Sequence, residues 1–298
     1  MNKNSKKAWL YLLPAIAFLA VFMVYPLIDV FIYSFEENFN FVTGSDSVGL
    51  YNYERVLSDP NFTSALKNTA ILVFVTVPLS TVLALVIAVA LSSVKAIKKA
   101  FQTIYFLPYV TNTIAVGMVF VGLFASNDGQ GFVGLANRVI GFFGGGEIDF
   151  ITGPYWAKML VLSVYTIWMV LPFKILILTS ALASVKQDYY NAAKIDGTSK
   201  WRTFRKITVP MISPTLFYLI ITGFIGAFKA YNDAVALFGE DLNSAGMNTI
   251  VGYIYNMLFS DGGGYPSYAS AAAVILFFIV LTVTCINLTV SRKHVHYS

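Results

Sequence analysis

Six long apolar segments limit what this chain can fold into more than any other feature of its sequence. They cover about residues 9–35, 69–91, 104–124, 159–182, 216–237 and 269–290. A bilayer core of ~30 Å needs roughly 20 apolar residues for each helix that crosses it, and every one of these segments has that length. Hydrophobic residues make up 57% of the chain and charged residues only 12%, unlike soluble domains. The sequence therefore predicts an all-α membrane protein with six transmembrane helices in a single transmembrane domain, residues 1–298.

The distribution of charge along the chain predicts its orientation in the membrane. Acidic residues gather in alternate connections, and the remaining connections are rich in lysine and arginine. The cations that we expect in the cytoplasm, where such residues are in excess, are Lys3, Lys6, Lys7, Lys95, Lys98, Lys99, Lys186, Lys194, Lys200, Arg202, Arg205, Lys206, Arg292 and Lys293. Both termini are then cytoplasmic. The net charge of +5 is a signal of topology and does not indicate a nucleic-acid partner.

The longest polar stretch is the loop 183–214, between the fourth and fifth predicted helices. Tyr189, Ala192, Ala193 and Asp196 recur at i, i+3, i+4 and i+7, so they share one face of a short helix. Gly197 follows them and permits a backbone reversal that a residue with a Cβ would resist. Because alanine lets two backbones approach closely, this face suits docking into a groove on another protein.

A second helix is predicted to follow the glycine. Ser199 can cap a helix that runs from about Lys200 to Val209, and we expect Pro210 and Pro214 to close it. The two halves together form a helix–glycine–helix elbow.

The elbow resembles the EAA coupling loop of permease subunits of binding-protein-dependent ABC importers, usually written EAA-x-x-D-G-A-(x)-I-x-L-P. Asn191-Ala192-Ala193 takes the place of E-A-A, Asp196-Gly197 that of D-G, and a segment ending at Pro210 closes the pattern. The usual Glu is replaced by Asn191, which makes a charged contact a neutral hydrogen bond. The resemblance extends over nearly the whole chain, through GLYNYERVLSDPNFTSALKNT before the second span, FLPYV at the third and YASA at the sixth.

These segments are similar to those of sugar permeases of the maltose, glycerol-3-phosphate and multiple-sugar type, and the first span looks like that of the first permease of a pair. The resemblance implies the type I importer fold in the bacterial cytoplasmic membrane. It implies as partners a second homologous permease, two ATPase subunits and an extracellular or lipid-anchored sugar-binding protein. Coupling to the ATPase would involve Tyr189, Asn191, Ala192, Ala193, Asp196, Gly197 and Pro210.

No cofactor, metal or catalytic group is expected in this chain. The pattern G-x-x-x-x-G-K-[ST], which cradles nucleotide phosphates, does not occur in the sequence. ATP and Mg²⁺ would therefore bind to the partner ATPase. His294 and His296 stand near the C-terminus without other ligands close in sequence, and the single Cys285 cannot form an intrachain disulfide.

Polar groups inside the predicted helices mark a candidate translocation path, because a charge within the membrane is costly and by default faces a cavity. Lys229 and Asp233 are spaced i, i+4, so they can pair on one face of the fifth helix. Sugar hydroxyls suit amide and carboxylate partners, and sugar rings stack on aromatic side chains. The residues that we expect to line the path are Trp168, Lys229, Tyr231, Asn232 and Asp233.

The sequence leaves alternatives open. Lys229 and Asp233 can instead form a purely structural ion pair, and Lys174 in the fourth helix can extend its ammonium group toward an interface. For the whole chain, the alternative to an ABC permease is a stand-alone, ion-coupled secondary transporter or channel. Such a protein would have no use for a docking elbow. A membrane enzyme is disfavoured, since the predicted helices contain no paired carboxylates and no histidine.

Overall fold

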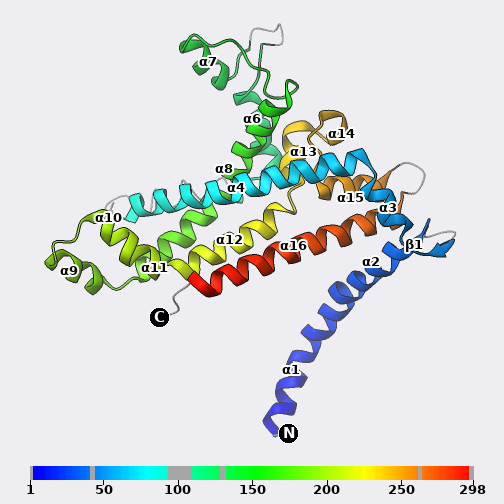
Figure 1. Ribbon diagram of the computed structural model, residues 1–298, viewed down its shortest axis with the longest axis horizontal. Helices are drawn as coiled ribbons and strands as arrows, with labels where there is room; N and C mark the ends of the chain where they lie inside the picture. Colours follow the sequence, from blue (N-terminus) through cyan, green and yellow to red (C-terminus); the bar gives the residue numbers. More distant parts are fainter. Residues whose placement is uncertain (1–2, 41–43, 93–108, 128–131, 261–263, 295–298) are drawn as a thin grey trace. The chain divides into compact units, whose positions relative to one another are not determined.

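The computed structural model describes residues 3–40, 44–92, 109–127, 132–260 and 264–294 (Figure 1). The predicted basic turn with Lys95, Lys98 and Lys99, the first part of the predicted third span with FLP at 106–108, and His296 lie outside the described residues. The described chain is mostly helical and divides into two compact units.

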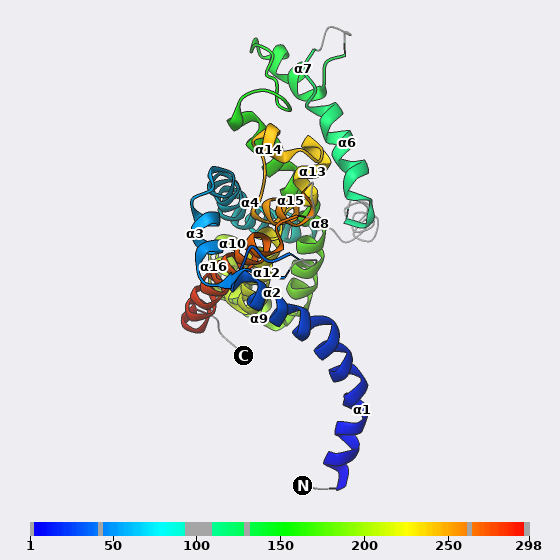
Figure 2. The same ribbon diagram turned by 90° about the vertical axis from the view of Figure 1, so that its right-hand side faces the viewer.

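The first unit comprises Met1–Thr63 and Ile250–Phe278. Figure 2 shows its first three elements as one continuous helical rod. The elements of this unit are α1 (Lys3–Leu19), the π-helical turn η1 (Ala20–Val24), α2 (Tyr25–Phe35), β1 (Glu36–Glu37), β2 (Ser47–Val48), α3 (Tyr51–Leu57), α15 (Ile250–Phe259) and the first part of α16 (Pro266–His294). Tyr253 joins the two stretches of chain, because its hydroxyl donates to the Asp59 carboxylate at 2.8 Å and its ring packs edge-on against Phe62.

A two-stranded antiparallel hairpin in this unit was not predicted. It pairs Glu36 with Val48 and Glu37 with Ser47. Strands of two residues leave no hydrophobic alternation in the sequence, so periodicity could not reveal them. The all-α description holds for the rest of the described chain.

The second unit comprises Ser64–Thr249 and Ile279–Ser298, and it contains nearly all the residues discussed below. Its elements are most of α4 (Pro60–Ser92), α6 (Thr113–Leu123), α7 (Leu135–Phe142), α8 (Tyr155–Ser184), α9 (Gln187–Ile195), α10 (Lys200–Thr203), the π-helical turn η2 (Phe204–Thr208), α11 (Val209–Met211), α12 (Ser213–Ala227), α13 (Asn232–Phe238), α14 (Leu242–Ala245) and the end of α16.

Two hydrophobic clusters hold the second unit together. The first joins α4, α6, α8 and α13 through Leu72, Phe120, Tyr165 and Leu237. The second joins α4, α8 and α12 through Ala84, Leu178 and Leu219. The long helices α4 and α8 take part in both clusters, so they form the frame on which the shorter helices are placed.

Four described helical stretches are long and apolar enough to cross a membrane: Trp9–Phe35, Pro60–Ser92, Tyr155–Ser184 and Pro266–Ser291. They confirm four of the predicted apolar segments. A fifth candidate is the pair Lys200–Met211 and Ser213–Ala227, which is bent by 66°. Of the predicted third span the structure describes the apolar helix α6. The predicted fifth span is wrong in its bounds, because α12 ends at Ala227 and a break precedes α13.

Both π-helical turns end two residues before a proline, Pro26 or Pro210. A proline ring inside an α-helix clashes with the carbonyl four residues earlier. In a π turn each N–H donates to the carbonyl five residues earlier instead of four. In η2 the N–H of Val209 donates in this way to the carbonyl of Phe204. The local widening lets the helix pass through the proline.

The prediction that Pro210 closes the second helix of the loop is therefore wrong. Helical structure continues through η2 and α11 to Met211, and the sharp bend comes at Ile212, before Pro214 opens the first turn of α12. Proline is well tolerated in a first helical turn, where its missing N–H has no partner to lose.

Candidate functional sites

The predicted elbow is present as two short arms, α9 and the continuous run α10–η2–α11, joined at Gly197. Gly197 has a φ of +65°, a left-handed conformation that glycine adopts without steric cost. The N–H of Thr198 donates to the Ala193 carbonyl at 2.9 Å, which is the closing bond of a Schellman motif. The predicted reversal at the glycine is confirmed.

The second arm begins as the sequence predicted. The Ser199 hydroxyl oxygen accepts from the N–H of Arg202 at 3.4 Å and so caps α10. Charged residues at the ends of the first arm complement its helix dipole, since Asp188 lies in its first turn and Lys194 in its last. Local sequence chemistry thus accounts for both arms.

The elbow encloses a hollow of about 550 Å³, which we call the alanine hollow. Ala193 is buried beside it. Its lining residues are Tyr189, Ala192, Ala193, Asp196, Thr198, Arg202, Thr203, Lys206 and Ile207. The structure therefore brings together the four residues that helical spacing placed on one face. Asn191 is exposed and does not line the hollow, and Pro210 lies further along the second arm.

Two large apolar side chains on the elbow were not singled out in the sequence. Ile195 is 87% exposed and Trp201 is 70% exposed, with Trp201 stacked on Phe204 at 5.6 Å between ring centroids. Exposed apolar groups that cluster on a short polar segment are typical of an interaction surface. Their occurrence inside a basic loop was the signal that could have identified them.

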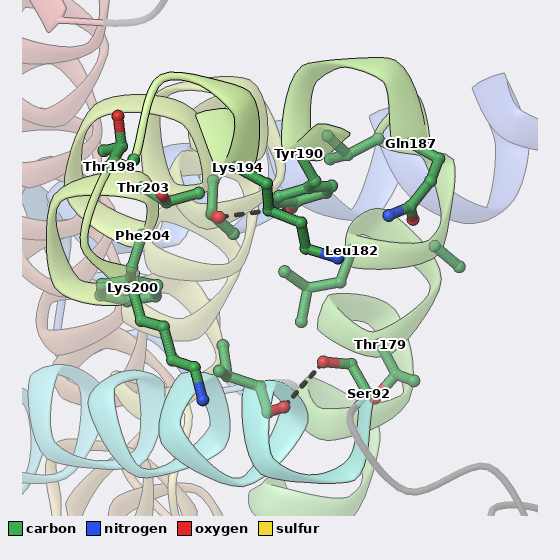
Figure 3. A pocket seen from close by; sticks show the side chains of 15 residues that line it. Ser92, Thr179, Leu182, Gln187, Tyr190, Lys194, Thr198, Lys200, Thr203 and Phe204 are labelled. Atoms are coloured by element: carbon green, nitrogen blue, oxygen red, sulfur yellow. Dashed lines mark hydrogen bonds between the residues drawn. The ribbon is translucent and has the colours of Figure 1, made fainter. Parts of the chain in front are cut away.

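A second space, which we call the lysine cavity, lies between the elbow and the last turns of α4 and α8 (Figure 3). It has a volume of about 750 Å³. The side chains of Lys194 and Lys200 both extend into it, Lys194 toward Leu182 of α8 and Lys200 toward α4 (Figure 3). The Tyr190 hydroxyl lies 3.3 Å from that of Thr208 in the wall of this cavity.

Asp233 lies in the first turn of α13 and faces α8. Its Oδ2 accepts from the Thr166 hydroxyl at 2.9 Å. Trp168, two residues further along α8, is 47% exposed, and its ring centroid lies 6.4 Å from that of Phe120. Tyr231 and Asn232 form the start of α13. The sequence did not single out Thr166, because a threonine carries no charge that would mark it within an apolar helix.

The predicted i, i+4 pairing of Lys229 with Asp233 is wrong. It required one continuous helix, but α12 ends at Ala227 and Lys229 lies in the turn that follows, with its N–H on the Gly226 carbonyl at 3.0 Å. Lys229 is exposed, and Asp233 has Thr166 as its partner instead. Neither the path nor a structural ion pair can therefore rest on this spacing.

Lys174 is the most deeply enclosed cation of the described chain, with only 4% of its surface exposed. Its ammonium group donates to Ser80 Oγ at 2.7 Å, Thr81 Oγ1 at 2.8 Å and the Val77 carbonyl at 3.3 Å, which uses all three of its hydrogens. Gly223 of α12 covers it, since a Cβ there would lie 3.4 Å from Nζ. The alternative that Lys174 extends toward a membrane interface is wrong. Its ammonium group binds oxygens of α4 where α4 and α8 pack together.

Comparisons with known proteins agree with this geometry. A family model described as "Binding-protein-dependent transport system inner membrane component" matches residues 77–293. The lactose transport system permease protein LacF of Rhizobium radiobacter is 33% identical over 282 residues, which cover 94% of this chain and 91% of that protein. The arabinooligosaccharides permease AraP of Bacillus subtilis is 30% identical, over 96% of this chain and 90% of that protein. A trehalose/maltose permease, MalF of Thermococcus litoralis, is 28% identical over 97% and 95%.

Solved structures share the fold. A chain of a bacterial alginate ABC transporter, in complex with a periplasmic protein bound to an alginate pentasaccharide, superposes with a TM-score of 0.82 at 22% identity, over 98% of this chain and 96% of that one. A second structure, of a bacterial ABC transporter involved in the import of the acidic polysaccharide alginate, gives a TM-score of 0.81 at 23% identity, over 98% of both chains. The multi-pass membrane chain therefore belongs to the family of binding-protein-dependent transport system inner membrane components, the permease subunits of ABC importers.

Proposed function

We propose that this chain is the transmembrane subunit of an ATP-driven carbohydrate importer and forms half of its translocation path. The observation that carries the proposal is the alanine hollow, because a small-residue helix face beside a capped glycine reversal suits insertion into a partner. Relatives named as permeases for lactose, arabinooligosaccharides and trehalose/maltose support a carbohydrate as the substrate.

The proposed assembly has a second homologous permease, two ATPase subunits that bind ATP and Mg²⁺, and an extracellular or lipid-anchored sugar-binding protein. This subunit forms one permease domain that crosses the bacterial cytoplasmic membrane six times, with both termini inside. Four long apolar helices, the bent pair ending in α12 and the apolar α6 support six crossings. The inward excess of lysine and arginine supports the orientation.

In the proposed cycle, ATP binding closes the two ATPases and moves the elbow with them. The first arm follows α8 after Val185 and Lys186, and the second arm leads into α12 through the bend at Ile212. Displacement of the elbow is therefore passed to α8 and α12 together. The membrane domain has two arrangements, one open to each side of the membrane, and the bound nucleotide shifts the equilibrium between them.

The sugar passes along Trp168, Lys229, Tyr231, Asn232 and Asp233. Asp233 uses Oδ2 for Thr166, so Oδ1 is able to accept from a sugar hydroxyl. We expect both Asp233→Asn and Lys229→Met to reduce uptake of radiolabelled sugar at an unchanged level of membrane insertion. Unaltered uptake in both variants would show that the path lies elsewhere.

Purification of a tagged chain from its native host in mild detergent tests the assembly. We expect a second permease and an ATPase to co-purify, and transport in liposomes to require ATP and the binding protein. A chain that purifies alone and transports along an ion gradient without ATP would overturn the proposal in favour of a secondary transporter or channel.

A further inference from the structure

The lysine cavity lies on a different face of α9 from the alanine hollow. Gln187, Tyr190 and Lys194 line the cavity, whereas Tyr189, Ala192, Ala193 and Asp196 line the hollow. Of the lining residues only Thr198 and Thr203 border both spaces, so a partner inserted along the alanine face of α9 leaves the lysines of the cavity to another ligand. The cavity is enclosed by α4, α8 and both arms of this chain (Figure 3).

Two kinds of polar group line the cavity beside the hydroxyls of Tyr190, Thr198 and Thr208. Lys194, Lys200 and the Gln187 amide are donors, and none of them has a hydrogen-bond or ionic partner within the described residues. No described acidic residue lines the cavity. Three hydroxyl groups already donate to backbone carbonyls at 2.7–3.1 Å and so offer only acceptor lone pairs: those of Ser92, Thr179 and Thr203.

Two cations beside acceptor hydroxyls fit a ligand that has both an anionic group and hydroxyl groups. A phosphate accepts charge-assisted hydrogen bonds from ammonium groups, and the hydroxyls of a polyol donate to the lone pairs of the wall. We propose that the lysine cavity binds a phosphate ester of a polyol.

The remaining wall of the cavity favours a lipid as the source of this group. Val89, Leu182, Ala183 and Val185 are apolar and lie where α4 and α8 end, which is where membrane helices meet headgroups. Basic pockets at the cytoplasmic ends of membrane helices attract anionic headgroups. A glycerol phosphate headgroup bound here joins the elbow to α4 and α8, so the coupling step under the proposed function depends on it.

Binding is measured on the purified chain, with whatever partners co-purify, after delipidation in detergent. The probes are short-chain phosphatidylglycerol, short-chain phosphatidylcholine and soluble glycerol 3-phosphate. The test variant is Lys194→Gln/Lys200→Gln. Its control, Lys186→Gln/Arg205→Gln, removes the same charge from the elbow at exposed positions that line neither space.

We expect phosphatidylglycerol to bind more tightly than phosphatidylcholine, and its affinity to fall roughly fivefold for each lysine removed. The control variant and Lys194→Arg/Lys200→Arg should bind as the native chain does, which also excludes misfolding as the cause. If glycerol 3-phosphate binds with the same dependence on the two lysines, the site is supported and its ligand is a soluble phosphate ester.

Equal loss of affinity in the test and control variants would overturn the proposal, since it would indicate general attraction to a basic surface. So would unchanged lipid affinity combined with loss of a co-purifying ATPase, which would make the cavity a protein-docking surface. Neither the lipid-binding measurement nor the co-purification uses ATP or sugar. The proposal of a lipid site can therefore fail while the importer assignment stands, and the importer assignment can fail while the lipid site stands.

Discussion

The two ends of the α4–α8 pair are built in opposite ways. Where both helices begin, Asn68 is buried and uses every polar atom: Nδ2 donates to the carbonyls of Gly246 and Asn248 at 3.1 and 2.8 Å, and Oδ1 accepts from the Tyr155 hydroxyl at 2.8 Å. Where both helices end, the elbow leaves two hollows and exposed cations. We call these the closed end and the open end.

The difference indicates which end of the helix pair is structurally fixed and which end binds a partner or ligand. Buried polar groups that are fully paired fix one arrangement, and the closed end has no surplus donors at Asn68. Polar groups without partners beside hollows are typical of surfaces that bind. Lys174 lies between the two ends and is paired like the closed end.

The largest effect is expected at the open end, from Ala193→Trp. An indole at this buried position fills the alanine hollow and blocks a partner, so uptake should fall to background while the chain still inserts in the membrane. Ala193→Ser keeps a small side chain and should keep uptake. ATP-driven uptake and co-purification of the ATPase are the measurements. Normal uptake in the tryptophan variant would contradict docking along this face.

A smaller effect is expected midway, at the oxygens around Lys174. Removing two acceptors with Ser80→Ala/Thr81→Val leaves a buried ammonium poorly paired and should lower the free energy of unfolding by about 2–3 kcal/mol. In a Lys174→Met background the same changes should cost little. Thermal unfolding in detergent of the four proteins measures this coupling. Additive effects would mean that the hydroxyls act on α4 alone.

The closed end should respond less, because water at the helix ends can replace part of what is lost. We expect Asn68→Ala to lower the free energy of unfolding by about 1–2 kcal/mol. Tyr155→Phe, which removes only the bond to Oδ1, should cost about half as much. Uptake by the folded fraction should be unchanged in both variants. Loss of uptake without loss of stability would show that the closed end moves during transport.

The sequence predicted the open end better than the rest of the molecule, because its determinants are local. The i, i+3, i+4 spacing from Tyr189 to Asp196, the reversal at Gly197 and the cap at Ser199 each depend on a few neighbouring residues. The long apolar spans were equally predictable from length and hydropathy.

The predictions that were wrong concern features that depend on contacts between segments distant in the sequence. The run 216–237 has the length of one span and contains no proline, yet α12 ends at Ala227. After the break α13 packs closely on α6, where a Cβ on Gly117 would lie 2.6 Å from that of Ala236, and a contact of this kind between distant segments leaves no local signal in the sequence. Likewise, nothing near Lys174 in the sequence indicates that Ser80 and Thr81 would surround it.

The smallest effect is expected at Asp149, in the loop before α8. Burial alone would raise the pKa of this carboxyl group, but hydrogen bonds from the Thr152 hydroxyl and from the N–H groups of Thr152 and Ile151 outweigh burial and hold the pKa below its ordinary value. A lowered pKa in the folded state adds stability that is fully present above the ordinary carboxyl pKa of about 4, and this stability is lost as the pH falls from that value through the lowered pKa of the folded state.

The destabilisation caused by Asp149→Asn should therefore be larger at about pH 7 than at about pH 3, with a difference below about 1 kcal/mol because the carboxylate is partly exposed. Thermal unfolding of the native chain and of Asp149→Asn at the two pH values measures it. An equal destabilisation at both pH values would contradict the prediction, since it would mean that the hydrogen bonds of this turn do not favour the charged form of Asp149.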